Sequence, residues 1–271
     1  MTLKNLMVHL DQGQRTAHRL ELAAALARRH EARLVGVFGQ LAQAQQVGVV
    51  ATWPPESYVE AAEASRALFE KSAAGLAHAE WRDINRGSDA EVIRLVTQIA
   101  RYFDLAVLGQ YDDRGKAYEP AELVHEVVLN CGRPVLILPY IWNFAPIGKR
   151  PLIAWNDTRE ASRALNDSLA LIADCTEALV LSLAPNREDA EASCAEAVRH
   201  LGCHGIEATS EVFVLAEEEG VGAMDMLLNR ASDRTADLLI MGAHSGSPFS
   251  ARGSGTRHIL RHMTVPVLMS S

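Results

Sequence analysis

Residues 238–256, LLIMGAHSGSPFSARGSGT, combine residue types that can hold a phosphate group. Four apolar residues predict a buried strand that runs into Gly242, and a loop rich in glycine and serine follows. Gly255 and Thr256 then open an amphipathic pattern that predicts a helix. Glycine lets a backbone come close to a ligand, and the amides at a helix start attract anions, so this stretch is suited to bind phosphate. A plain turn after a strand is the alternative.

A local group of basic residues near the end of the chain supports an anionic ligand. The formal net charge is −8, yet Arg252, Arg257, His258, Arg261 and His262 follow one another closely. Solvated helix charges are the alternative for the last two. Because nucleic-acid binding generally needs a basic surface, we expect no nucleic-acid partner.

The sequence offers few groups for catalysis. It has no G-x-S-x-G or H-E-x-x-H motif, and its four cysteines form no C-x-x-C pair. His244 and His258 flank the glycine-rich loop and could contact phosphate or exchange protons, although solvated histidines are the more common reading. We therefore predict no catalytic residue and no bound metal.

The chain repeats itself in order, which indicates one domain duplicated. Segments 6–11, 34–38, 105–109 and 134–138 match segments 152–157, 179–183, 238–242 and 266–270. Apolar residues between them recur at helical spacing, and continuously apolar strands that alternate with helices predict a parallel sheet covered on both faces. We expect two doubly wound, Rossmann-like α/β domains, 1–145 and 146–271, with a loop over residues 40–58.

No apolar run approaches the roughly 20 residues that span a bilayer, and the first residues lack the apolar core of a signal peptide. We expect a cytoplasmic protein that does not bind membranes.

The chain resembles the universal stress protein family in its tandem-domain form. Nucleotide-binding members carry Gly, two residues, Gly, nine residues, then Gly with Ser or Thr. Gly242, Ser245, Gly255 and Thr256 fall at these spacings, with Ser245 in place of the middle glycine and Gly246 beside it.

The second half also resembles the family's opening strand and helix. Asn156 stands where the family has Asp, and it can still bond a ribose hydroxyl or an adenine edge. The adjacent Asp157 is an alternative source of the carboxylate. In the first half the loop positions after Gly109 are Asp112 and Glu122, whose carboxylates would repel phosphate, so that half resembles a degenerate site.

The resemblance implies the strand order 3-2-1-4-5, with adenine near the first two strand ends. Trp155 either stacks on the base or narrows the pocket. The expected ligand-binding residues are Trp155, Asn156, Asp157, Ser182, Leu183, Met241, Gly242, His244, Ser245, Gly246, Gly255, Thr256 and Arg257.

The resemblance further implies a stress-response protein that binds ATP or a related adenine nucleotide in its second domain, with or without Mg²⁺, in a regulatory role. A nucleotide-free scaffold that acts through protein partners and a slow ATP hydrolase are the alternatives. We expect the two halves to pair within one chain through segments 134–138 and 266–270, about a pseudo-two-fold axis, and a homodimer remains open.

Overall fold

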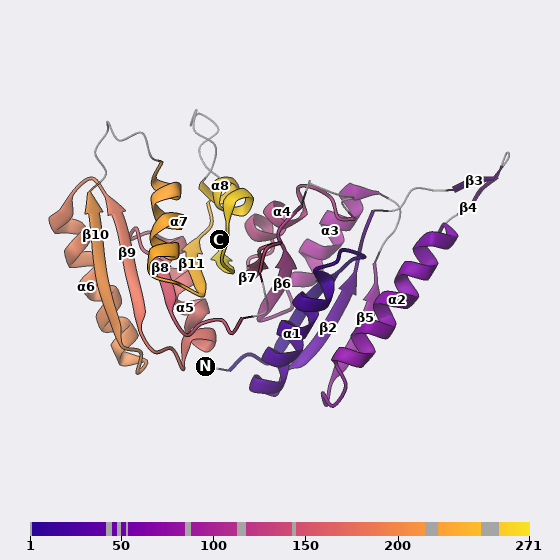
Figure 1. Ribbon diagram of the computed structural model, residues 1–271, viewed down its shortest axis with the longest axis horizontal. Helices are drawn as coiled ribbons and strands as arrows, with labels where there is room; N and C mark the ends of the chain where they lie inside the picture. The colour runs from indigo at the N-terminus through magenta and orange to yellow at the C-terminus, as the bar shows by residue number, and fades with distance from the viewer. Residues whose placement is uncertain are drawn as a thin grey trace. The chain divides into compact units, whose positions relative to one another are not determined.

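The structure, a computed structural model, describes residues 2–41, 45–47, 50–52, 54–84, 88–112, 118–142, 145–214, 222–244 and 255–271. It divides into two compact units, Thr2–Tyr140 and Ile141–Ser271. In each unit strands and helices alternate, as the sequence predicted (Figure 1).

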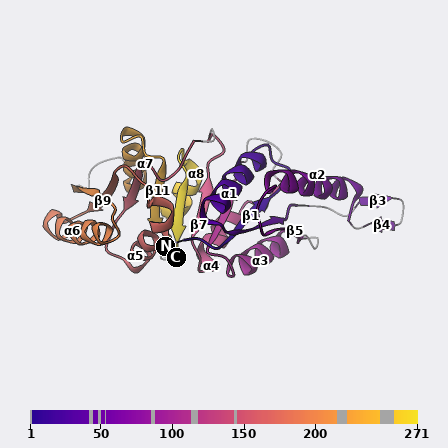
Figure 2. The ribbon, with the colours of Figure 1, turned by 90° about the horizontal axis from the view of Figure 1, so that it is seen from below.

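The first unit contains a parallel sheet in the order β5-β2-β1-β6-β7, which is the predicted order 3-2-1-4-5. Helices α1 and α2 cover one face of this sheet, and α3 and α4 cover the other (Figure 2). The bounds are β1 Asn5–Leu10, α1 Thr16–His30, β2 Arg33–Phe38, α2 Glu56–Ser72, β5 Ala79–Asp83, α3 Asp89–Ala100, β6 Leu105–Gly109, α4 Leu123–Asn130 and β7 Val135–Leu138.

A short antiparallel pair, β3 (Gln45–Val47) with β4 (Val50–Thr52), lies where the sequence predicted only a loop. Helix α2 then begins at Glu56, inside the predicted loop. Pro55 is the N-cap of α2, with φ −67° and ψ 152°. Proline is fixed near this φ and suits a helix start, so the two prolines introduce a helix instead of excluding one.

The second unit repeats the first in the order β10-β9-β8-β11-β12, again all parallel and again 3-2-1-4-5. Its bounds are β8 Pro151–Ala154, α5 Arg159–Ile172, β9 Ala178–Ala184, α6 Arg187–Cys203, β10 Ala208–Val214, α7 Ala223–Asp233, β11 Leu238–Gly242, α8 Gly255–His262 and β12 Val267–Ser270. Pairing between the last strands of the two units stays a prediction.

The central strands are buried on both faces. Leu6, Met7 and Val8 of β1 are consecutive residues with no exposed surface, as are Leu238 and Leu239 of β11. Since neighbouring residues of a strand point to opposite faces, both faces of each sheet are covered. Within the described ranges, no helix is long and apolar enough to cross a membrane.

Candidate functional site

A cavity of about 310 Å³ opens at the carboxyl ends of β8, β9 and β11 in the second unit. Ligands of open α/β sheets bind at this edge, where the strand order reverses. Leu181, Leu183, Met224, Leu227 and Met241 give the cavity an apolar wall. The volume lies at the lower end of the roughly 300–1,000 Å³ of small-molecule sites, so the cavity suits one flat, mostly apolar group.

Trp155 lines this cavity from the residue that follows β8. Its backbone N–H donates to the Leu181 carbonyl at 2.8 Å, which extends the pairing of β8 with β9. Its indole Nε1–H donates to Ser193 Oγ of α6, also at 2.8 Å. Trp155 is therefore held at its backbone and at its indole nitrogen, and its ring forms a rigid part of the cavity wall.

The turn between β8 and α5 presents the polar residues of the rim. Asn156 lines the cavity, and its Oδ1 accepts the Thr158 hydroxyl at 2.8 Å. Thr158 caps α5 by accepting the Ala161 N–H at 3.3 Å. Asp157 between them has a φ of 55°, a left-handed conformation that Asp tolerates better than most residues. Asp157 is exposed.

Gly242 ends β11 against the first turn of α5, which the sequence did not predict. A Cβ at this position would lie 2.6 Å from the Glu160 carbonyl carbon and 2.7 Å from the Ala161 nitrogen. Glycine is thus required here by the packing of α5. Glu160 itself lines the cavity, and the hydrogen bond from Arg159 is the main cause that lowers its pKa.

Two hydrogen bonds join His244 and Thr256, the residues at the two ends of the predicted phosphate loop. The His244 N–H donates to Thr256 Oγ1 at 3.2 Å, and the Thr256 hydroxyl donates to the His244 carbonyl at 3.1 Å. Thr256 is buried, whereas His244 is exposed and lines the cavity. A Cβ at Gly255 would lie 3.0 Å from Met224 Sδ, so α8 supports the α7 wall of the cavity.

Ser182 and Arg257, which were also predicted to bind the ligand, are not among the described residues that line the cavity. Ser182 is buried and forms a hydrogen bond with Cys194 of α6. It lies on the face of β9 opposite to Leu181 and Leu183, which line the cavity. Arg257 is half-buried on α8. Ser245 and Gly246 lie outside the described residues.

Helix α7 contributes cavity residues that the sequence analysis missed. Ala223, Met224 and Leu227 lie on one face of it, at helical spacing, which is equally typical of a core-facing helix. Asp225 on the same helix accepts a hydrogen bond from His258 Nε2 of α8 at 2.7 Å. His258 thus joins α8 to α7 and is engaged by a carboxylate.

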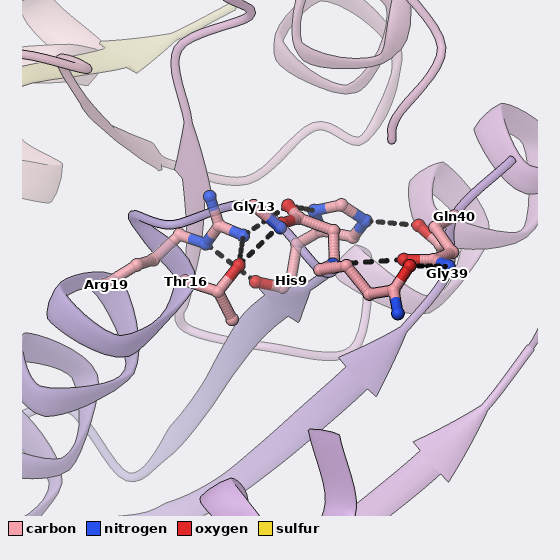
Figure 3. A network of polar contacts seen from close by, with 8 residues as sticks. His9, Gly13, Thr16, Arg19, Gly39 and Gln40 are labelled. Carbon is pink, nitrogen blue, oxygen red and sulfur yellow. Dashed lines mark hydrogen bonds and ion pairs between the residues drawn. The ribbon is translucent and has the colours of Figure 1, made fainter. Parts of the chain in front are cut away.

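The corresponding crevice of the first unit holds a buried ion pair (Figure 3). Asp11, directly after β1, accepts a hydrogen bond from Arg19 Nη2 at 2.6 Å, and both side chains are about 95% buried or more. The Thr16 hydroxyl and the Gly13 N–H also donate to Asp11, at 2.6 and 2.5 Å. Burial raises the pKa of Asp11, but the charges of Arg19 and His9 and the hydrogen bonds from Thr16 and Arg19 together outweigh it and lower the pKa to about 2.

Arg19 closes this crevice between β1 and β6. Its Nε–H donates to the His9 carbonyl at 2.7 Å, and a Cβ at Gly109 would lie 2.1 Å from its Nη1. The guanidinium therefore lies against the bare backbone of Gly109, at the strand end where the sequence analysis expected a degenerate ligand loop. The expected obstacles were Asp112 and Glu122, but the described geometry adds a cation inside the crevice itself.

Two titratable neighbours of the ion pair have shifted pKa values. Burial, followed by the charge of Arg19, lowers the pKa of His9 to about 4, and His9 Nε2–H donates to the Gly39 carbonyl at 2.7 Å. Burial and the charge of Asp11 raise the pKa of Glu119 to about 7. At neutral pH His9 is thus neutral, and Glu119 is partly protonated.

One group of potential metal ligands occurs in the described part of the chain. Glu122, His125 and Glu126 of α4 and its N-cap place ligand atoms within 4.8 Å of one another. Both carboxylates are more than 40% exposed, and His125 Nδ1 lies 3.8 Å from each. Such groups are common on solvated helices, so this grouping by itself does not indicate a metal site.

Replacing Arg19 with Met should destabilise the protein by about 3–5 kcal/mol, because the buried Asp11 carboxylate loses its counter-ion. The double variant Arg19→Met/Asp11→Asn should recover part of the loss. Urea unfolding of the three proteins at pH 7 measures both values. A single variant as stable as the wild type would contradict the assigned ion pair.

His9 should make stability depend on pH between about 4 and 6.5. Its folded pKa is about 4 and its ordinary value is 6.5. The unfolded chain therefore binds more protons in this range, and the contribution of His9 is lost as pH falls, by about 3 kcal/mol in total. Glu119 has the opposite effect on the free energy of unfolding, because its pKa is raised in the folded protein and its contribution to stability grows as pH falls.

The comparison with His9→Gln isolates the His9 contribution, because Glu119 titrates in both proteins. The difference in unfolding free energy between wild type and variant should shrink as pH falls from 7 to 4. A difference that stays constant over this range would show that His9 does not titrate as assigned.

Comparison with known proteins shows the fold of the whole chain and a family match for its second half. Residues 157–271 match the universal stress protein family. A universal stress protein from Archaeoglobus fulgidus DSM 4304 has a TM-score of 0.72 at 15% identity, and the match covers 98% of both chains. A functionally unknown protein from Pseudomonas aeruginosa PAO1 has a TM-score of 0.60 at 15% identity and covers 99% of this chain and 92% of its own.

Another Archaeoglobus fulgidus universal stress protein, solved in complex with dAMP, covers 51% of this chain and 98% of its own, with 17% identity and a TM-score of 0.33. No curated protein matches the sequence. The predicted resemblance is confirmed: the second half of the chain matches the universal stress protein family, and the chain as a whole has the fold of a universal stress protein of matching length.

Proposed function

We propose that the second domain binds one adenine nucleotide in the cavity beside Trp155 and Gly242, and that the bound state serves regulation in a stress response. The observation that carries the proposal is the cavity itself, which opens at the switch point of the sheet and has an apolar wall. A purine is flat and largely apolar, and the Trp155 ring is held by Ser193 as part of the wall. ATP, which the family resemblance implies, is one member of this ligand class.

The proposal includes one ligand per chain. In the first domain the Arg19 guanidinium fills the space against Gly109, and Asp11 is satisfied by three donors. A ligand there would have to displace a buried ion pair, which is costly. We therefore assign binding to the second domain alone.

A regulatory role fits the chemistry of this cavity better than catalysis. ATP hydrolysis needs a group that positions water and a ligand for Mg²⁺. Asp157, the candidate from the sequence, is exposed and is not one of the described residues that line the cavity. Slow hydrolysis would require groups beyond those named here.

Protein purified from cells and then denatured should release an adenine nucleotide. Titration calorimetry of the stripped protein with adenosine, AMP and ATP in turn should give one site per chain for those that bind. Two equivalent sites would refute the asymmetry between the domains. If none of the three produced heat at millimolar concentration, the nucleotide-free scaffold would be the better account.

Gly255→Val should weaken adenosine binding by about 1–3 kcal/mol, because the new side chain would press Met224 toward the cavity. Glu122→Val is the matched change at the start of α4 in the first domain, and it should leave affinity unchanged. Calorimetry on both variants makes the comparison. Equal losses at the two positions, or no loss at Gly255, would count against the assigned cavity.

A further inference from the structure

The lining of the cavity beside Gly242 includes an acidic residue of α5. Glu160 lines the cavity, and its side chain is only 12% exposed. Its Cβ would lie 2.8 Å from a Cβ built on Gly242, so the side chain starts directly beside the end of β11. A ligand phosphate that approached Gly242 from the cavity would come close to this acidic side chain.

The start of α5 is already occupied by this chain's own groups. The Ala161 N–H donates to the Thr158 hydroxyl at 3.3 Å. The backbone of α5 also lies too close to Gly242 to leave space for a phosphate between them. The helix start that would attract an anion has an internal anion instead.

The donors at the ends of the glycine-rich loop are engaged as well. The His244 N–H donates to the Thr256 hydroxyl oxygen at 3.2 Å, and the Thr256 hydroxyl donates to the His244 carbonyl at 3.1 Å. Arg159 pairs with Glu160, but its side chain is 90% exposed and its charge is screened by water. The described surroundings of Gly242 are therefore suited to uncharged groups more than to a chain of phosphates.

We infer that the cavity takes an adenine nucleoside or nucleoside monophosphate in preference to the triphosphate, with Glu160 as the residue that sets this preference. The inference rests on the proposed function and narrows its ligand class. A triphosphate carries several negative charges past Glu160, whereas adenosine carries none. Because like charges a few ångströms apart repel even near solvent, the charge of Glu160 lowers affinity for ATP and leaves affinity for adenosine unchanged.

The test compares adenosine, AMP, ADP and ATP, each without and with Mg²⁺, by titration calorimetry on the stripped protein. The wild type should bind AMP about tenfold more tightly than ATP, a difference of the size expected for one like charge near a protein surface. Glu160→Gln preserves the size of the side chain and removes its charge. It should raise affinity for ATP several-fold and leave adenosine within about twofold.

Glu196→Gln is the control variant. It removes the same charge from another carboxylate that is ion-paired with an arginine, Arg199 of α6, and Glu196 does not line the cavity. It should leave the order of affinities unchanged.

Two results would overturn the inference while the proposed function stands: wild type that binds ATP as tightly as AMP, or a Glu160→Gln variant whose affinities for adenosine and ATP change equally. If none of the four compounds bound to the wild type, the proposed function itself would fail, and the inference with it.

Discussion

The close approach of a helix to the end of a strand governs the crevice at the carboxyl strand ends in each domain of this protein. In each domain the fourth strand of the order 3-2-1-4-5 ends in glycine, Gly109 of β6 or Gly242 of β11. The helix that follows the first strand lies against this glycine. A Cβ at either glycine would lie well under 3 Å from atoms of that helix. Closed packing at the switch point therefore depends on a missing side chain.

The two domains use this shared geometry for opposite charges. In the first, Arg19 of α1 reaches the glycine, and its cation is neutralised by Asp11 inside the crevice. In the second, Glu160 of α5 reaches it, and its partner Arg159 lies in solvent. The Arg19 cation, neutralised by Asp11, fills the crevice of the first domain. The Glu160 anion is paired with an arginine that lies in solvent, so the apolar cavity of the second domain stays open beside it. The duplicated fold thus contains one crevice filled by the protein and one that can take a ligand.

The sequence was sufficient to predict the fold because the fold rests on repeated local patterns. Continuous apolar strands, helical periodicity and the matched segments each predict parallel α/β domains, and all of them concern neighbours in sequence. The family motif likewise led to Trp155, Asn156, Leu183, Met241, Gly242 and His244, which line one cavity. The prediction that the loop extends to residue 58 was wrong, because α2 begins directly after Pro54 and Pro55. Proline is common both within loops and at helix starts, and only the packing of the following residues decides between the two.

The internal ions could not be predicted, because their meaning depends on partners that no local pattern reveals. Arg19 stands in an amphipathic helix among other charged residues, where a solvated arginine is the usual expectation. It becomes a buried counter-ion only because Asp11, His9 and Gly109 meet it from two neighbouring strands. Glu160 similarly resembles an ordinary acidic residue in a first helical turn, which the helix dipole alone would explain. Its place at the cavity depends on Gly242, 82 positions later in the sequence, because a side chain at Gly242 would overlap the start of α5. Charge sign at a glycine-lined crevice is therefore a property of the tertiary fold, and it distinguishes two domains that share the same strand order.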